Sequence, residues 1–225
     1  AAGSIVARAE GADAQLHLDA PHLWDGVKDP YLYTCVVRLL QDGKPVDEVT
    51  TKVGLRSFSV DPKKAFFLNG KPYLLHGVNY HQDSYESGWA MTGAQRERDY
   101  RIIRDMGCTA VRMAHYQHCD HEYSLCDRLG LCVWTEIGII NKMSADDSDA
   151  HVLSDGFGDN AKQQLRELIK QNYNHPSICF WGISNEILIG GISEQLVENH
   201  KELNALAKEM DPTRLTTIAH VSMTP

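Results

Sequence analysis

The chain has 225 residues and a formal net charge of −8 at pH 7; 43% of its residues are hydrophobic and 23% are charged. This balance is ordinary for a globular protein and supplies enough apolar side chain for one large domain or two modest ones. Acidic and basic residues are interspersed, which argues against a nucleic-acid partner, because that surface needs clustered Lys and Arg. No apolar run approaches the roughly 18 residues of a membrane helix, so we expect no membrane partner.

The opening segment and the cysteines bear on the compartment. The segment AAGSIVARAEGADAQ lacks the basic start and apolar centre of a signal peptide. A signal peptide can be removed during maturation, so a bacterial cytoplasmic location and a periplasmic or secreted one both stay open. The six cysteines form no C-x-x-C pair and fall mostly in apolar segments, which favours reduced, buried thiols over a disulfide framework.

Residues 1–58 have the pattern of short strands separated by turns. Alternating or β-branched runs occur at IVARAE, QLHLDA, YLYTCVVRLL and VDEVTTKVG. Between the last two runs, Gln41-Asp42-Gly43-Lys44 predicts a hairpin turn. No helical period interrupts these runs. The segment is therefore predicted to be an all-β domain, as in part of a sandwich.

Strand and helix patterns alternate from about residue 73 onward. Strands are predicted over 73–79, 109–113, 131–136, 177–183 and 214–219. Helices are predicted over 93–106, 121–129, 161–172 and 193–210. The fourth strand is almost wholly apolar, as expected for a strand covered on both faces. Such alternation predicts a parallel sheet in a second domain, which we place at residues 59–225.

Two folds with parallel sheets compete for this segment, the (β/α)8 TIM barrel and the doubly wound sheet. A doubly wound sheet normally carries a glycine-rich phosphate loop after an early strand, and the sequence has none. In a barrel the active site lies at the C-terminal ends of the strands. Polar residues stand at the end of each predicted strand: Asn79, Arg112, Glu136, Asn185-Glu186 and His220. We therefore expect a TIM barrel truncated after about its fifth strand.

Glu186 is the strongest candidate for chemistry. It follows Phe180-Trp181-Gly182-Ile183-Ser184-Asn185, where a buried apolar strand ends. A carboxyl group there faces a cleft and can protonate a leaving-group oxygen. The neighbouring Asn185 can hydrogen-bond a substrate hydroxyl. In the alternative interpretation, the Asn-Glu pair merely ends the strand and begins a loop.

Other polar side chains follow the first two predicted strands of the second domain. Arg112 could orient a carboxylate through paired hydrogen bonds, and His115 could bond a sugar hydroxyl. His81 and Asp83 have similar standing. In the competing explanation, Arg112 forms a structural ion pair and the histidines are hydrogen-bonded within the fold without contacting a substrate. Three tryptophans could stack on sugar faces, although each is more readily explained as core: Trp89, Trp134 and Trp181.

Three segments resemble markers of glycoside hydrolase family 2, which contains β-galactosidases, β-glucuronidases and β-mannosidases. The segment NYNHPSICFWGISNE, ending at Glu186, resembles the acid/base segment of that family. The segments GVNYHQD (77–83) and AVRMAHYQHCDHEYSLCDRLGLCVWTE (110–136) resemble two others, in the same order. The N-terminal Leu23-Trp24 followed by Pro30-Tyr31-Leu32-Tyr33 resembles the immunoglobulin-like sandwich that precedes the barrel. The resemblance thus implies an immunoglobulin-like β-sandwich, partial or complete, at 1–58 and a catalytic barrel from 59 onward.

This resemblance implies an exo-acting β-glycosidase that retains configuration. Glu186 would be the general acid/base, Asn185 would contact the 2-hydroxyl of the sugar and Arg112 would lie beside the nucleophile. The sugar pocket would be lined by His81 and His115, with Asp83 a weaker assignment. Retention needs a second carboxylate about 5–5.5 Å from the first. In the family that nucleophile lies on about the seventh strand, so we expect this chain to be a fragment that is inactive alone.

The resemblance also bears on metals, partners and the sugar. Some members hold magnesium through a Glu-x-His shortly after the equivalent of Glu136, but Ile140 and Lys142 stand here, so we expect no metal and no cofactor. The surroundings of His81 and His115 favour β-galactosidase, with β-glucuronidase as the alternative. A non-catalytic carbohydrate-binding fragment and a barrel hydrolase with a local nucleophile also stay open. Exposed barrel edges predict low stability, or self-association into a homo-oligomer.

Overall fold

The computed structural model describes residues 3–140, 156–187 and 192–220. Its helices are η1 (Gly26–Lys28), α1 (Gly93–Asp105), α2 (Asp120–Leu129), α3 (Phe157–Asn172) and α4 (Glu194–Met210). Its strands are β1 (Tyr33–Gln41), β2 (Lys44–Val53), β3 (Phe58–Asp61), β4 (Ala65–Leu68), β5 (Lys71–Pro72), β6 (Gly77–Tyr80), β7 (Ala110–Met113), β8 (Cys132–Glu136), β9 (Ile178–Asn185) and β10 (Leu215–Ala219).

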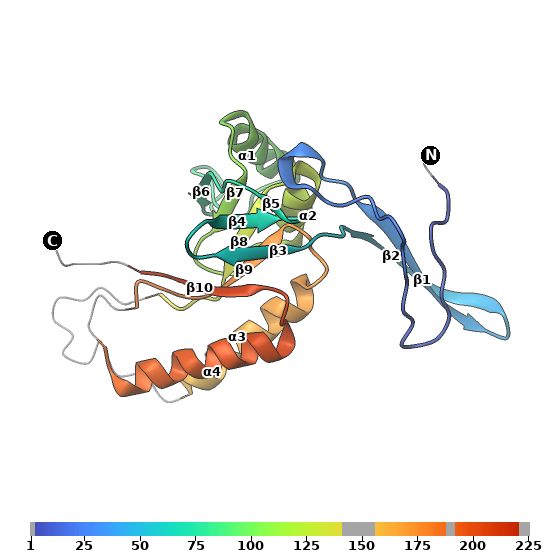
Figure 1. Ribbon diagram of the computed structural model, residues 1–225. Coiled ribbons are helices and arrows are strands. Elements are labelled where there is room, and N and C mark those ends of the chain that lie inside the picture. The colour runs from blue at the N-terminus through green and yellow to red at the C-terminus, as the bar shows by residue number, and fades with distance from the viewer. Residues whose placement is uncertain (1–2, 141–155, 188–191, 221–225) are drawn as a thin grey trace.

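The five strands β6 to β10 form one parallel sheet in the order β10-β9-β8-β7-β6. Each strand lies beside the strand that precedes it in the chain, with a helix between each successive pair (Figure 1). The order never reverses, as it must in a doubly wound sheet. This arrangement confirms the predicted parallel sheet and corresponds to five consecutive strands of a barrel, with β6 and β10 at its edges.

The predicted helices and strands of the second domain are confirmed, with boundaries shifted by a few residues. Helix α1 begins at a capping box in which the Thr92 hydroxyl and the Gln95 side chain each bond the other's backbone N–H. Helix α2 ends at Gly130, whose φ of 75° suits glycine. Local chemistry in the sequence therefore sets both ends.

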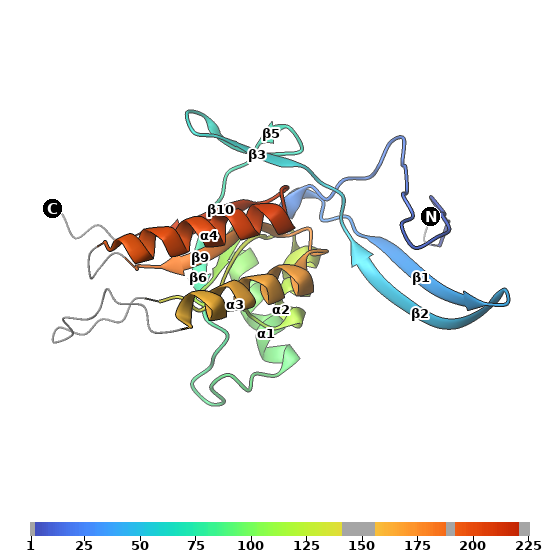
Figure 2. The ribbon, with the colours of Figure 1, turned by 90° about the horizontal axis from the view of Figure 1, so that it is seen from below.

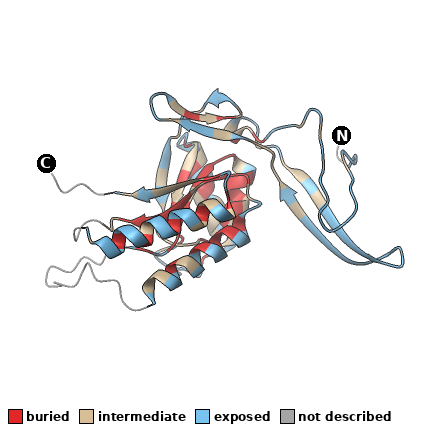
Figure 3. Ribbon diagram, turned by 60° about the horizontal axis from the view of Figure 1, so that its bottom comes forward, coloured by how far each residue is buried: buried red, intermediate tan, exposed pale blue. Residues whose placement is uncertain are grey.

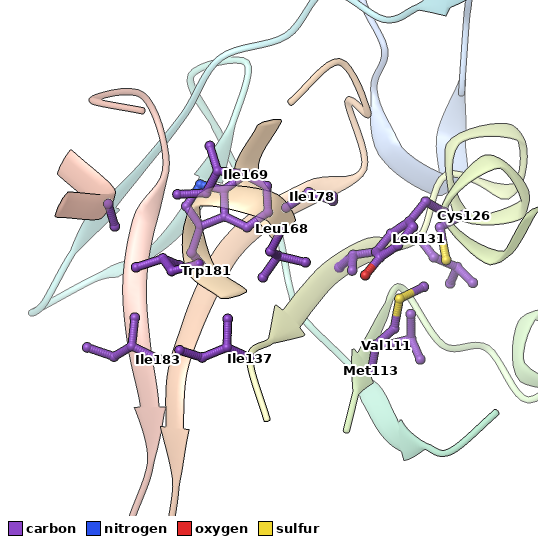
Figure 4. Packing of buried hydrophobic residues seen from close by; sticks show 14 of the residues in the cluster. Val111, Met113, Cys126, Leu131, Ile137, Leu168, Ile169, Ile178, Trp181 and Ile183 are labelled. Carbon is purple, nitrogen blue, oxygen red and sulfur yellow. The ribbon is translucent and has the colours of Figure 1, made fainter. Parts of the chain in front are cut away.

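The main hydrophobic core lies between the parallel sheet and its helices. Buried residues gather on the sheet and on the helix faces turned toward it (Figure 3). Trp181 and Ile183 of β9 belong to this core, as do Leu168 and Ile169 of α3 (Figure 4). Trp181 is completely buried, so it is a core residue rather than a platform for a sugar.

The N-terminal segment departs from the predicted sandwich. β1 and β2 form a two-stranded hairpin that extends away from the parallel sheet (Figures 1 and 2). Its turn is the predicted one, with positive φ at Asp42 and Gly43, the backbone of a type I′ turn. The strands expected at 5–10 and 15–20 are wrong, because those residues are irregular and mostly exposed. A β-pattern becomes a strand only where a neighbour accepts its backbone hydrogen bonds, and none does so within the described residues.

No helix or strand was predicted over residues 59–72, but β3, β4 and β5 form a three-stranded antiparallel sheet there. Phe66 and Leu68 of β4 pack against Cys132 and Cys179, which lie near the starts of β8 and β9. This sheet therefore covers the N-terminal end of the parallel strands. The polar C-terminal ends lie at the opposite edge.

Two buried carboxylates, Asp211 and Asp127, bind side chains near the parallel sheet. Asp211 accepts hydrogen bonds from Trp181 Nε1 (2.9 Å), Arg214 Nη1 (2.8 Å) and the Thr213 hydroxyl (2.6 Å). Burial opposes its charge, but the bonds from Thr213, Arg214 and Trp181 outweigh burial and lower the pKa of Asp211 to about 2.

Asp127 binds His175 in a second buried pair, with His175 Nδ1 2.6 Å from Asp127 Oδ2. Burial disfavours the charged ring, yet the hydrogen bond to Asp127 outweighs burial and raises the pKa of His175. The main-chain oxygen of Asp127 also accepts from Trp24 Nε1 at 2.8 Å, which fastens the N-terminal segment to α2.

Candidate active site

Arg112 is the centre of a polar cluster at the C-terminal edge of the parallel sheet. Its guanidinium makes a bidentate contact with the Glu136 carboxylate, with Nε 2.7 Å from Oε1 and Nη2 3.2 Å from Oε2. Nη2 also donates to Asn185 Oδ1 at 2.6 Å, and Nη1 lies 3.5 Å from Asn79 Oδ1. The cluster joins the ends of β6, β7, β8 and β9, because three of these strands each place one side chain around the charge that β7 supplies.

Glu136 is completely buried and balances the charge of Arg112. A buried carboxylate without a partner would be costly, and a two-pronged bond to arginine is the strongest compensation available. The Arg112 guanidinium also lies 4.5 Å from the Trp134 ring centre, in cation–π contact. Glu136 is thus the immediate ionic partner of Arg112.

Gly182 makes room for this cluster. A Cβ atom built there would lie 2.5 Å from Trp134 Nε1 and 2.5 Å from Glu136 Cγ. Only glycine leaves space for both side chains, because real Cβ contacts are not that close. The glycine follows the apolar Phe180-Trp181 pair in the sequence, but its steric role becomes visible only when β8 lies beside β9.

His115 joins the cluster through its Nδ1 atom, which lies 3.1 Å from Glu136 Oε2 and 3.2 Å from Arg112 Nη2. The two hydrogens of Nη2 already point to Glu136 and Asn185, so His115 Nδ1 carries a proton and donates it to Glu136. In the neutral ring, Nε2 is then left as an acceptor.

His81 extends the site outward. Its ring centre lies 5.2 Å from that of His115, and its Nδ1 lies 3.4 Å from the Tyr116 hydroxyl. Burial, with the nearby His115 ring, lowers the pKa of His81. Tyr116 in turn contacts the ring of Trp89, which is 61% exposed, at 4.6 Å. These rings form an aromatic wall beside the Arg112 cluster.

Glu186 follows Asn185 at the end of β9. Its φ of 53° is left-handed, and its backbone N–H donates to Ala219 O at 2.8 Å. The residue is half-buried. Asn185 itself is buried, and its N–H donates to Ile139 O at 2.8 Å. The backbone at the candidate acid is thus held from both sides, by the β8 connection and by β10.

The predicted site residues fall into three groups. Arg112, His115 and Asn185 contact one another directly or through Glu136. His81 touches His115, and Glu186 is adjacent to Asn185 in the chain. Asp83 is exposed and no hydrogen bond from its side chain to the Arg112 cluster is present in the described part of the chain. Its charge acts at a distance, contributing after burial to a raised pKa of Tyr116.

Two contacts in this arrangement were not predicted from the sequence. Tyr116 and Trp89 are in contact although they lie far apart in the chain, and no periodicity predicts that contact. The close approach of Trp134 to Arg112 was also not predicted. It follows from β7 and β8 lying side by side, with Arg112 and Trp134 directly opposite each other in the register.

Within residues 3–140, 156–187 and 192–220, no group of three or more His, Cys, Asp or Glu side chains is placed to hold a metal ion. Ile140 is exposed, and Lys142 lies outside the described residues. In the same ranges, no helix has the length and apolarity needed to cross a bilayer.

Two family models match the chain. The model described as "Glycosyl hydrolases family 2, TIM barrel domain" matches residues 59–225, and that described as "Glycosyl hydrolases family 2" matches residues 1–56. A β-glucuronidase from Bacteroides fragilis is 45% identical over 218 residues, covering 95% of this chain and 31% of the relative. A β-galactosidase from Bacteroides ovatus is 36% identical over 174 residues, covering 77% of this chain and 20% of the relative.

Solved structures agree with these matches. The crystal structure of an FMN-binding β-glucuronidase from Facaelibacterium prausnitzii L2-6 superposes with a TM-score of 0.85 at 46% identity. The match covers 94% of this chain and 32% of that one. Bacteroides uniformis β-glucuronidase 2, covalently bound to cyclophellitol-6-carboxylate aziridine, gives 0.78 at 35% identity, over 92% of this chain and 25% of that one. The chain spans about a third or less of the length of these relatives.

Proposed function

The chain belongs to glycoside hydrolase family 2, and from that premise we propose that the protein containing it hydrolyses terminal β-linked glycosides with retention of configuration. The observation that carries the proposal is the fixed position of Asn185 and Glu186 beside Arg112, at the C-terminal ends of the parallel strands. Glu186 is the proposed general acid/base.

The chemistry of each step follows from the residues around this edge. The Glu186 carboxyl donates its proton to the glycosidic oxygen as the bond to the sugar breaks, and it later takes a proton from the attacking water. Asn185, held by Arg112, offers its side-chain N–H to a hydroxyl on the sugar. His115 Nε2 is an acceptor for a second hydroxyl. His81 lies beside His115 and is proposed to contact the sugar from the same side, with Asp83 as an outer contact.

A second carboxylate has to attack the anomeric carbon in this mechanism. Glu136 is a poor candidate, because it is completely buried and both of its oxygens are bound by Arg112. We propose that a later barrel strand supplies the nucleophile, and we expect residues 1–225 alone to show no turnover.

The relatives revise the expected sugar. The β-galactosidase preference rested on the surroundings of His81 and His115. However, the relatives matched at 45% and 46% identity are both named β-glucuronidase. We therefore propose a β-D-glucuronide as the first substrate class and a β-galactoside as the second, the latter supported by the B. ovatus relative.

We propose that residues 1–58 belong to an immunoglobulin-like domain, of which the β1–β2 hairpin is one part, and that 59–225 belong to the barrel. Exposed apolar side chains on the hairpin support this, because such a surface is normally covered. The open edges at β6 and β10 would favour self-association of the chain when isolated.

The test compares aryl β-glucuronide, β-galactoside, β-mannoside and β-glucoside as substrates for this chain and for a C-terminally extended protein. Turnover of the glucuronide only by the extended protein, abolished by Glu186→Gln, is the expected result. Glu194→Gln is the matched control, since Glu194 is an exposed carboxylate in the first turn of α4.

Other outcomes would identify the alternatives. A carbohydrate-binding protein without catalysis would bind sugar and turn over none of the four glycosides. Turnover by residues 1–225 alone would indicate a local nucleophile. Labelling by cyclophellitol-6-carboxylate aziridine, the compound bound in the B. uniformis structure, would support glucuronide recognition independently of turnover.

A further inference from the structure

The side chains of β9 alternate from Trp181 to Ile183 as a strand requires, and this alternation breaks after Ile183. Trp181 and Ile183 point into the core between sheet and helices. Gly182 faces the opposite way, toward Trp134 and Glu136. Continued alternation would turn Ser184 toward Glu136 and Asn185 toward the helices. That orientation would remove Asn185 from Arg112.

The observed orientations are the reverse. Asn185 accepts a hydrogen bond from Arg112, whereas Ser184 reaches His200 on α4. The pairing with β10 shows where the alternation breaks. β10 advances one residue, from Thr217 to Ile218, while β9 advances two, from Gly182 to Ser184. One extra residue in β9 is a β-bulge, which re-aims the side chains that follow it.

The contact between Ser184 and His200 holds this bulge against α4. His200 Nδ1 lies 2.8 Å from Leu196 O, a carbonyl that can only accept, so Nδ1 carries the proton. In the neutral ring Nε2 is then an acceptor, and the Ser184 hydroxyl, 2.8 Å away, donates to it. Ser184 is completely buried. Its hydroxyl therefore has a defined direction and no access to water.

We propose that Ser184 and His200 are positioning residues for the general acid/base, because together they hold the bulge that turns Asn185 toward Arg112 and sets the backbone of Glu186. The inference rests on the proposed glycosidase function and deepens it. Neither residue touches the substrate. Their effect passes along the backbone of β9, from Ser184 through Asn185 to Glu186.

The backbone bonds from Asn185 to Ile139 and from Glu186 to Ala219 do not depend on either side chain. Removing the Ser184 hydroxyl should therefore leave the strand paired while the carboxyl of Glu186 loses its alignment. A misaligned acid slows the step that needs a proton. That step limits substrates with a poor leaving group, whereas a leaving group that departs as an anion needs little help.

The experiment uses the extended, active protein and two glycosides of the same sugar, one with a methyl and one with a 2,4-dinitrophenyl leaving group. For Ser184→Ala and His200→Ala we expect kcat/KM to fall about 10-fold on the methyl glycoside, the effect of losing roughly one hydrogen bond. On the dinitrophenyl glycoside we expect less than about a 3-fold change. His200→Gln, whose amide oxygen can still accept from Ser184, should recover most of the loss.

Thr216→Val is the matched control. The Thr216 hydroxyl donates to Asn204 Oδ1 at 2.6 Å and so also joins a strand to α4, but from β10, where Thr216 pairs with Trp181 before the extra residue of β9. We expect the same small change on both substrates. The double variant Ser184→Ala/His200→Ala should be no worse than either single variant, because both remove the same bond.

The outcomes separate the two proposals. Wild-type protein that cleaves neither glycoside, or turnover that survives Glu186→Gln, would overturn the proposed function and this inference with it. Wild-type activity that depends on Glu186, together with losses in Ser184→Ala and His200→Ala that are equal on both leaving groups or absent, would overturn the positioning role alone. If Ser184→Ala fails to fold, the comparison of His200→Gln with His200→Ala decides the question in the same way.

Discussion

Replacing Glu136 by glutamine should destabilise the chain severely, although the change removes no carbon atom. The side chain is 1% exposed and its partner Arg112 is 14% exposed. The substituted amide could still accept from Arg112 Nε, but its hydrogens would face Arg112 Nη2 and His115. A hydrogen bond to a charged group contributes about 1.5–3 kcal/mol, and an unpaired buried charge costs about 3–5 kcal/mol. We therefore expect a loss of about 3 kcal/mol in the free energy of unfolding.

An exposed arginine–glutamate pair on the hairpin provides a control for the buried pair. Arg38 Nε lies 2.6 Å from Glu48 Oε2 on the hairpin, almost the same distance as between Arg112 and Glu136, but these side chains are 58% and 47% exposed. Glu48→Gln should cost less than about 0.5 kcal/mol, because water and salt screen exposed pairs.

Thermal unfolding followed by circular dichroism measures both variants. One kcal/mol shifts the Tm of a domain of this size by about 2–4 °C. Glu136→Gln should therefore lower Tm by about 6–12 °C, and Glu48→Gln by no more than about 2 °C. Equal shifts in the two variants would show that burial of the Arg112 pair is not what makes it strong.

Three further predictions concern the stability of the fold and involve Gly182, Asp211 and His175. Gly182→Ala should cost about 1–3 kcal/mol, because its Cβ would overlap the Trp134 indole; unchanged stability in urea unfolding would contradict this. Asp211, with its pKa lowered to about 2, stabilises the fold above pH 4, and this stabilisation disappears as the pH falls from about 4 to 2. The stability difference between wild type and Asp211→Asn should shrink in that window. His175, with a raised pKa, contributes stability that is complete below pH 6.5 and is lost as the pH rises through its folded pKa, so His175→Gln should destabilise more at pH 5.5 than at pH 8.5.

Much of the second domain could be predicted from the chain alone. Helix and strand periods alternate, and the caps at Thr92 and Gly130 are local signals, so each element could be located within a few residues. Residues at the ends of successive parallel strands must meet at one edge. The meeting of Arg112 and Glu136 at this edge therefore followed from their positions, once the sheet was assumed to be parallel.

In the N-terminal part of the chain, local patterns did not predict the strands correctly. The runs at 5–10 and 15–20 alternate like strands, yet they are irregular in the structure. The sheet at 58–72 was not predicted, because its strands are at most four residues long. Short or unpaired β-segments depend on neighbours that a local pattern does not specify.

By itself, the sequence determined which residues stand at the strand ends and that the sheet is parallel, because both depend on local periodicity and chain order. Only the tertiary structure decided which way the last residues of β9 face. Strict alternation turns Ser184 toward Glu136 and Asn185 toward the helices, and the extra residue opposite β10 reverses both. The bulge arises from pairing between strands and from a hydrogen bond to a helix, and neither interaction is encoded in the period of a single strand.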